Sequence, residues 1–231
     1  MSTYCIADIH GCYDEFMELL ERIHFDSSLD ELYILGDAID RGEASVECLQ
    51  FIMRQKNTRF FIGNHEQMMM DYIDRTELFG WFTNGGRTTF SELNDLTGAE
   101  SAGILAYLRA CPYYETLEIN GKRYFLSHAG LDVSLPIESQ PRDALVWSRE
   151  EFYEYKGLGG YTCIFGHTPT FFIHGDYDNC DVWVDPRHND KICIDSGCVY
   201  GGALAAIRLE DHEIFYAQNI NNKIKKEGGS L

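Results

Sequence analysis

Side chains that suit metal binding gather in short polar segments, each placed directly after an apolar run. Their donors are the nitrogen and oxygen atoms of His, Asp and Asn, a set that suits Mn, Fe or Zn rather than a thiolate site. A carboxylate that bridges two ions about 3.5–4 Å apart is the usual arrangement for phosphate chemistry. The sequence therefore predicts a two-metal centre. Its candidate ligands are Asp8, His10, Asp37, Asn64, His128 and His167.

Asp37 is the candidate for the bridging carboxylate, because it is central in the order of these residues and follows Gly36. For Asp8 and His10 to reach the same ion, the chain has to turn at Gly11. A structure can test whether the chain turns at this glycine.

Other polar residues of the same loops predict the remaining steps of phosphate-ester hydrolysis. Two bound ions would lower the pKa of a bridging water, so that hydroxide is available near neutral pH for in-line attack on phosphorus. Arg41 has a planar fork that can hold two phosphate oxygens. His65 can donate a proton to the leaving alkoxide, and Asp40 is the candidate carboxylate that keeps it protonated and oriented.

Three strand–loop–helix units have to position the first three segments. Apolar runs predict strands at 3–7, 32–35 and 59–62, and apolar residues that recur every three or four positions predict helices at 13–23 and 44–54. Repeated units of this kind imply a parallel sheet with right-handed crossovers. The three loops would then lie on the same edge of that sheet.

Residues 67–111 are predicted to be mostly helical. The second half of the chain then changes character, and Asn120-Gly121 predicts a hairpin of strands 115–119 and 123–127. His128 and His167 follow predicted strands, and further strands are expected near the C-terminus. We expect a single domain over 1–220, lid-like insertions at about 131–160 and 170–190, and a frayed tail at 221–231.

Composition excludes several classes of protein. A formal net charge of −18 in 231 residues argues against nucleic acid as a partner. We find no run of 18 apolar residues and no N-terminal signal pattern, so we expect no membrane association and a cytoplasmic location. The eight cysteines contain no Cys-x-x-Cys pair, which predicts reduced thiols and argues against a zinc–thiolate site.

Taken together, the segments resemble the signature of the phosphoprotein phosphatases, within the calcineurin-like metallophosphoesterases. The longer stretches around them look most like the small bacterial and phage lambda-type serine/threonine protein phosphatases. Many relatives have Arg immediately before Gly-Asn-His, where this chain has Ile62. The resemblance rests on Asp8-x-His10, Gly36-Asp37-x-x-Asp40-Arg41-Gly42, Gly63-Asn64-His65-Glu66, His128-Ala129-Gly130, Trp147-Ser148-Arg149-Glu150 and Gly166-His167-Thr168.

This resemblance implies an α/β (α+β) fold, a central β-sandwich flanked by helices, with two divalent ions that are usually manganese. It implies an acid pair of His65 with Asp40, and a phosphate clamp of Arg41 and Arg149. The implied ligands of the first ion are Asp8, His10 and Asp37, and those of the second are Asp37, Asn64, His128 and His167.

Three functions stay open at this point. The first choice is a metal-dependent phosphatase whose partner is a phosphoserine- or phosphothreonine-containing protein or peptide. The alternative is the related symmetrical dinucleoside tetraphosphate (Ap4A) hydrolase, which shares the metal loops but typically carries Asp where this chain has Glu66. A catalytically inactive module that binds phosphorylated partners is the third, and the presence of every proposed ligand and acid argues against it.

Overall fold

Consecutive βα units form the first sheet, as the sequence predicts. In the computed structural model, which describes residues 1–155 and 157–219, the strands of these units pair in parallel. Each predicted boundary lies within two residues of the observed one. The elements are β1 (Thr3–Ile6), α1 (Tyr13–Arg22), β2 (Glu31–Ile34), α2 (Ser45–Arg54) and β3 (Thr58–Phe60).

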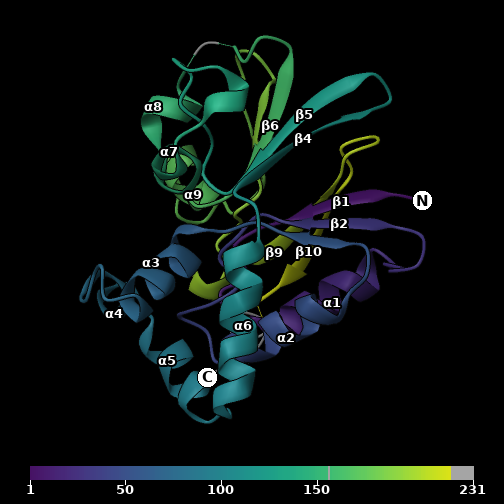
Figure 1. Cartoon of the computed structure of the whole chain (residues 1–231). Coiled ribbons are helices and arrows are strands. Elements are labelled where there is room, and N and C mark those ends of the chain that lie inside the picture. Colours follow the sequence, from purple (N-terminus) through teal and green to yellow (C-terminus); the bar gives the residue numbers. More distant parts are fainter. Residues whose placement is uncertain (156, 220–231) are drawn as a thin grey trace, which may run out of the picture.

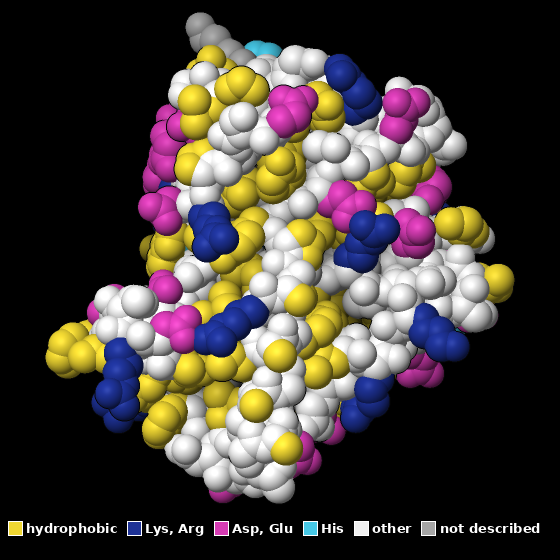
Figure 2. Space-filling view, in the orientation of Figure 1, with side chains coloured by type: hydrophobic (Ala, Val, Ile, Leu, Met, Phe, Trp, Pro, Cys, Tyr) yellow, Lys and Arg dark blue, Asp and Glu magenta, His cyan; other side chains and the backbone are white. Residues whose placement is uncertain are grey.

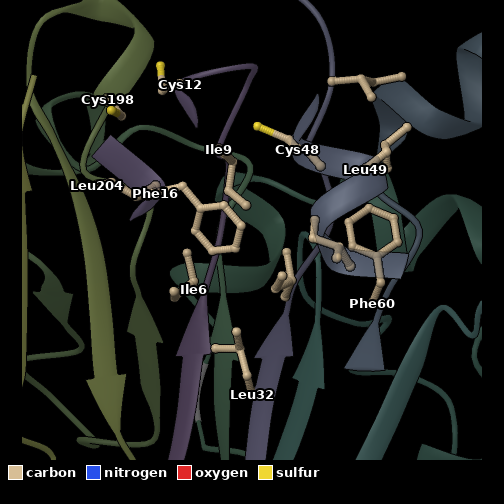
Figure 3. Close-up of a cluster of buried hydrophobic side chains, with 14 of the residues drawn as sticks. Ile6, Ile9, Cys12, Phe16, Leu32, Cys48, Leu49, Phe60, Cys198 and Leu204 are labelled. Carbon is tan, nitrogen blue, oxygen red and sulfur yellow. The ribbon is translucent and has the colours of Figure 1, made fainter. Parts of the chain in front are cut away.

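Two strands from the end of the chain extend this sheet on its other side. β9 (Ala203–Arg208) pairs antiparallel with β1, and β10 (Ile214–Gln218) pairs antiparallel with β9. The strand order is β10-β9-β1-β2-β3, so β1 is central. The outer face of the sheet packs against α1 and α2, and Phe16 of α1 is fully buried there (Figure 3).

The second sheet combines the predicted hairpin with three later strands. Its order is β4-β5-β6-β8-β7, with β5, β6 and β8 parallel. Its elements are β4 (Tyr114–Ile119), β5 (Lys122–Ser127), β6 (Tyr161–Phe165), β7 (Trp183–Val184) and β8 (Lys191–Cys193).

Apolar side chains from both sheets form one shared core. Cys5, Tyr33 and Ile207 of the first sheet belong to the same buried cluster as Leu126 and Ile164 of the second. Helices cover the outer faces of this pair of sheets (Figure 1). The expected β-sandwich flanked by helices is confirmed.

Between the two sheets the chain forms a helical segment, as predicted. Met69 and its neighbours on either side are buried in the core cluster under the first sheet. The helices are α3 (Asn64–Ile73), α4 (Gly80–Thr83), α5 (Arg87–Asn94) and α6 (Gly98–Ala110).

The two stretches expected to be irregular contain short helices. In 131–160, the buried side chains of Leu145, Val146 and Phe152 pack into a core cluster with Phe165. The lid function of both stretches stays a prediction, and the predicted tail at 221–231 lies outside the described residues. The elements are η1 (Ile137–Ser139), α7 (Arg142–Trp147), α8 (Glu150–Tyr153), α9 (Thr170–His174) and, before β9, η2 (Cys198–Tyr200).

Charged side chains on the face shown in Figure 2 are intermingled, with acidic and basic groups side by side rather than in one patch. Within the described residues, no helix is both long and apolar enough to cross a membrane.

Candidate metal centre

Left-handed turns carry the first two polar segments to the edge of the sheet. Asp8, His10 and Asp37 have φ angles of 53°, 47° and 51°. The His10 N–H donates to the Asp37 carbonyl at 2.9 Å, and the Gly11 N–H donates to the Ala38 carbonyl at 2.9 Å, so the two loops hold each other. The expected turn at Gly11 is therefore only the last part of a bend that begins at Asp8.

The predicted ligands of the second ion lie together. His128 Nε2 is 2.9 Å from Asn64 Oδ1 and 3.4 Å from Asp37 Oδ2. His167 Nδ1 is 2.9 Å from the same Asn64 oxygen and 3.2 Å from His128 Nε2. All four side chains are buried.

Two of the three predicted ligands of the first ion, His10 and Asp37, lie together beside this group, whereas Asp8 is not among the donors that cluster with them. His10 Nε2 is 3.6 Å from Asp37 Oδ2, the carboxylate oxygen that also faces His128. The other oxygen, Oδ1, accepts the His65 N–H at 3.0 Å. The Asp8 carboxylate accepts the His167 N–H at 3.0 and 3.1 Å. Asp37 Oδ2 is thus placed between the two sets, as a bridging oxygen would be.

Hydrogen bonding on the far side of the ring leaves His128 Nε2 free to bind a metal ion. Its Nδ1 is 2.8 Å from the Leu35 carbonyl, which can only accept, so Nδ1 carries the proton. Nε2 then presents its lone pair to the oxygens of Asp37 and Asn64. Electron-rich atoms that face one another at these distances fit a shared cation.

Two glycines allow the segments to approach this closely. A Cβ added at Gly63 would strike the Asp37 carboxylate, and one added at Gly166 would strike that of Asp8. The glycines that precede the Asn64 and His167 segments are therefore needed for the donors to meet.

Burial makes the negative charges of the cluster costly. It raises the pKa of Asp8 well above its ordinary value, and the charges of Asp195 and Asp37 add to that effect. Burial likewise lowers the pKa of His128 to about 3, so this ring is neutral at physiological pH. A neutral imidazole and a carboxylate are the forms that bind metal, and a bound cation would offset the repulsion among the acids.

His65 and Asp40 form a hydrogen-bonded pair beside the cluster. His65 Nδ1 lies 2.6 Å from Asp40 Oδ2, and the same carboxylate accepts from Trp81 Nε1 at 2.8 Å and from Thr89 Oγ1 at 2.6 Å. Burial raises the pKa of Asp40 to about 7, whereas burial and the charge of Arg41 lower the pKa of His65. The 2.6 Å contact with Asp40 therefore orients the His65 ring through Nδ1.

The second nitrogen of His65 points toward the metal ligands. Nε2 is 3.9 Å from Asp37 Oδ2 and has no hydrogen-bond partner in the described part of the chain. Nitrogen and oxygen donors of His10, Asp37 and His65 lie within 4.8 Å of one another. The geometry therefore allows His65 to donate a proton beside the ions or to bind one of them.

Both predicted phosphate-binding arginines lie at the centre. The Arg41 N–H donates to the Gly85 carbonyl at 3.2 Å, and its guanidinium contacts His10 Nε2 and lies 5.5 Å from the Tyr200 ring centroid. Arg149 lies beside the His167 segment, because its Nη1 donates to Thr168 Oγ1 at 3.1 Å.

Two important carboxylates were missed by sequence reasoning. Glu66 is fully buried and accepts the N–H groups of Asp37 and Ala38 at 2.9 Å and of Gly63 at 3.0 Å, so it fastens two ligand loops together. Its position in the first turn of α3 was a usable signal, because Glu there often accepts from the residue before the helix. Asp195 is buried close to Asp8, and nothing in its sequence context distinguishes it from a strand end.

Comparison with known proteins agrees with this geometry. The family model of the calcineurin-like phosphoesterases matches residues 1–213. The chain is 31% identical to serine/threonine-protein phosphatase 2 of Salmonella typhimurium over 218 residues, 90% of this chain and 92% of that protein. It is 24% identical to the symmetrical bis(5'-nucleosyl)-tetraphosphatase of Pasteurella multocida over 285 residues, 96% of this chain and 98% of that protein.

A solved structure shares the fold. A crystal structure described as a candidate diadenosine tetraphosphatase has a TM-score of 0.72 at 20% identity and covers 95% of this chain and 94% of that one. Fold and donor cluster together define a metallophosphoesterase, a hydrolase whose family depends on divalent metals. The chain belongs to the calcineurin-like phosphoesterase family.

Proposed function

We propose that this protein is a metal-dependent phosphomonoester hydrolase that acts on phosphoserine or phosphothreonine in proteins or peptides. The observation that carries the substrate class is the extent of the two alignments. The phosphatase aligns over 218 residues, within the 231 of this chain, whereas the dinucleotide hydrolase aligns over 285 and so has segments that this chain lacks.

Each residue of the centre has a role in this proposal. Asp8, His10, Asp37, Asn64, His128 and His167 would hold two ions, most simply Mn²⁺, with Fe or Zn as alternatives. Bound there, the ions would supply an activated water and neutralise phosphate charge. The protein's remaining contributions come from its own side chains.

The arginines and the acid pair act on the phosphate directly. Arg41 contacts His10 and Arg149 contacts Thr168, and from these positions their guanidinium groups would bind phosphate oxygens and orient the ester. His65 donates a proton from Nε2 to the departing serine or threonine oxygen. Asp40 holds the ring in position through Nδ1, since its carboxylate is itself fixed by Trp81 and Thr89.

We also propose that the protein works in the cytoplasm, without membrane or nucleic-acid partners. All eight cysteines are free thiols, which fits a reducing compartment.

One observation favours the dinucleotide hydrolase as a second candidate. A cavity of about 700 Å³ is lined by Tyr200, Phe172 and Tyr177, which are 56, 53 and 75% exposed, and the Tyr200 ring centroid lies 5.5 Å from the Arg41 guanidinium. Exposed aromatic faces can stack on nucleobases. Phe172 is exposed in this cavity, whereas its neighbour Phe171 is buried.

The deciding experiment compares kcat/KM for a phosphoserine peptide and for Ap4A, with Mn²⁺ restored after chelation. We expect the peptide to be the better substrate, and a Phe172→Ala variant to affect the two substrates alike. Strong preference for Ap4A, lost selectively in Phe172→Ala, would establish the dinucleotide hydrolase instead. Failure to turn over either substrate with any metal would favour a binding module.

A further inference from the structure

Two cysteines that are 186 positions apart meet at the N-terminal end of α1. Cys12 directly precedes that helix and Cys198 begins η2, and their sulfur atoms lie close to each other (Figure 3). Glu15, in the first turn of α1, brings a carboxylate to the same place. The two sulfurs and a carboxylate oxygen lie within 4.8 Å of one another, and all three residues are buried. The proposed catalytic centre uses none of them.

We propose that Cys12, Glu15 and Cys198 bind a third metal ion, Zn²⁺, at a site separate from the two-metal centre. Ligand atoms of a tetrahedral site with Zn–S bonds of about 2.3 Å lie about 3.8 Å apart, so small side-chain movements suffice. Asn219, also buried, contacts the Cys198 thiol, and its amide oxygen or a water completes the set of four. The absence of a Cys-x-x-Cys pair in the sequence argued against a zinc–thiolate site. The two cysteines of this site come from opposite ends of the chain, so their spacing gives no such signal.

The chemistry of the donors separates this site from the other one. Thiolates select Zn²⁺ over Mn²⁺, whereas the catalytic cluster has only nitrogen and oxygen donors. A cavity of about 600 Å³ reaches Cys12, Glu15 and Asn219 and gives an ion a way in. Further acidic residues line this cavity and attract cations. They are Asp14, Glu43 and Glu47.

An ion at this position would join two segments that support the phosphate clamp. Cys12 follows the loop of Asp8 and His10, and η2 carries Tyr200, whose ring lies 5.5 Å from the Arg41 guanidinium. The zinc would therefore be structural, and its loss should lower the melting temperature of the protein.

Cobalt absorption tests the proposal directly, because only sulfur ligands give a thiolate-to-cobalt charge-transfer band. The full-length protein is stripped of metal, supplied with excess Mn²⁺ to fill the catalytic cluster, and titrated with Co²⁺ and then Zn²⁺. We expect one equivalent of Co²⁺ to produce the band and Zn²⁺ to remove it. Cys198→Ser should abolish the band, whereas Cys111→Ser and Cys180→Ser, at the two half-buried thiols, should keep it.

A second variant keeps the test valid if Cys198→Ser does not fold. Glu15→Gln leaves both sulfurs in place and should weaken Zn²⁺ binding more than about tenfold. The proposal is overturned if the native chain gives no band, or if the band survives Cys198→Ser. Phosphatase activity with Mn²⁺ alone is scored separately, so loss of the zinc site and failure of the proposed function give different results.

Discussion

Replacing His65 with Asn tests whether the buried acid pair protonates the leaving group. In the structure, Nδ1 is held by Asp40 at 2.6 Å, which leaves Nε2, 3.9 Å from Asp37 Oδ2, as the only nitrogen able to serve the substrate. General acids contribute about 10²–10⁴-fold to turnover. A serine alkoxide needs the proton, whereas p-nitrophenolate leaves without one.

The expected effect of His65→Asn therefore depends on the leaving group. We expect kcat for a phosphoserine peptide to fall about 10²–10⁴-fold, and kcat for p-nitrophenyl phosphate to fall far less. Asp40→Asn should slow the same substrate, and the double variant should be no slower than His65→Asn, because the two residues act as a unit. Asp40 also accepts from Trp81 and Thr89, so its loss should cost about 1–3 kcal/mol of stability.

The assay is steady-state kinetics on both substrates, with metal content measured for each variant. The metal measurement matters because His65 shares a group of close donors with His10 and Asp37. Equal losses on the two substrates would refute the role of general acid, and a loss of bound metal would identify His65 as a ligand.

Three further substitutions test a buried carboxylate, a phosphate-binding arginine and a buried ion pair. Glu66→Asp shortens a side chain that accepts three backbone N–H groups, so we expect unfolding in urea to show a loss of about 1–3 kcal/mol, together with weaker Mn²⁺ binding in a metal titration. Arg149→Ala should lower kcat/KM for the phosphopeptide about 10–100-fold with metal content unchanged; an unaltered kcat/KM would restrict this arginine to its contact with Thr168. Lys191→Met leaves the buried Asp185 without its 2.9 Å partner and should cost about 3–5 kcal/mol in thermal unfolding while kcat stays the same.

The edge of the sheet where the site lies could be predicted from the sequence. Parallel strands place their following loops on one side, so recognising β1, β2 and β3 was enough to bring Asp8, Asp37 and Asn64 together. This inference needs only local hydrophobic patterns and the handedness of the crossovers.

Contacts between distant segments could not be read in the same way. The Asp40 carboxylate is fixed by Trp81 and Thr89, which are 41 and 49 positions away on short helices. Those helices have no pattern that connects them to the metal loops. The proximity of Cys12 to Cys198 could not be predicted from the sequence for the same reason, since it depends on the pairing of β9 with β1.

Left-handed turns at three of the candidate metal ligands show how the fold shapes the site in the absence of an ion. Positive φ angles at Asp8, His10 and Asp37 are unfavourable for residues with a Cβ, and they persist only where surrounding structure imposes them. Here the imposing contacts are backbone hydrogen bonds between the two loops and the buried Glu66 carboxylate, which holds Asp37 and Gly63 at once. The backbones of these loops are therefore positioned by the fold itself. The Arg41 guanidinium contacts His10 Nε2, so an ion that binds to this nitrogen has to displace that contact.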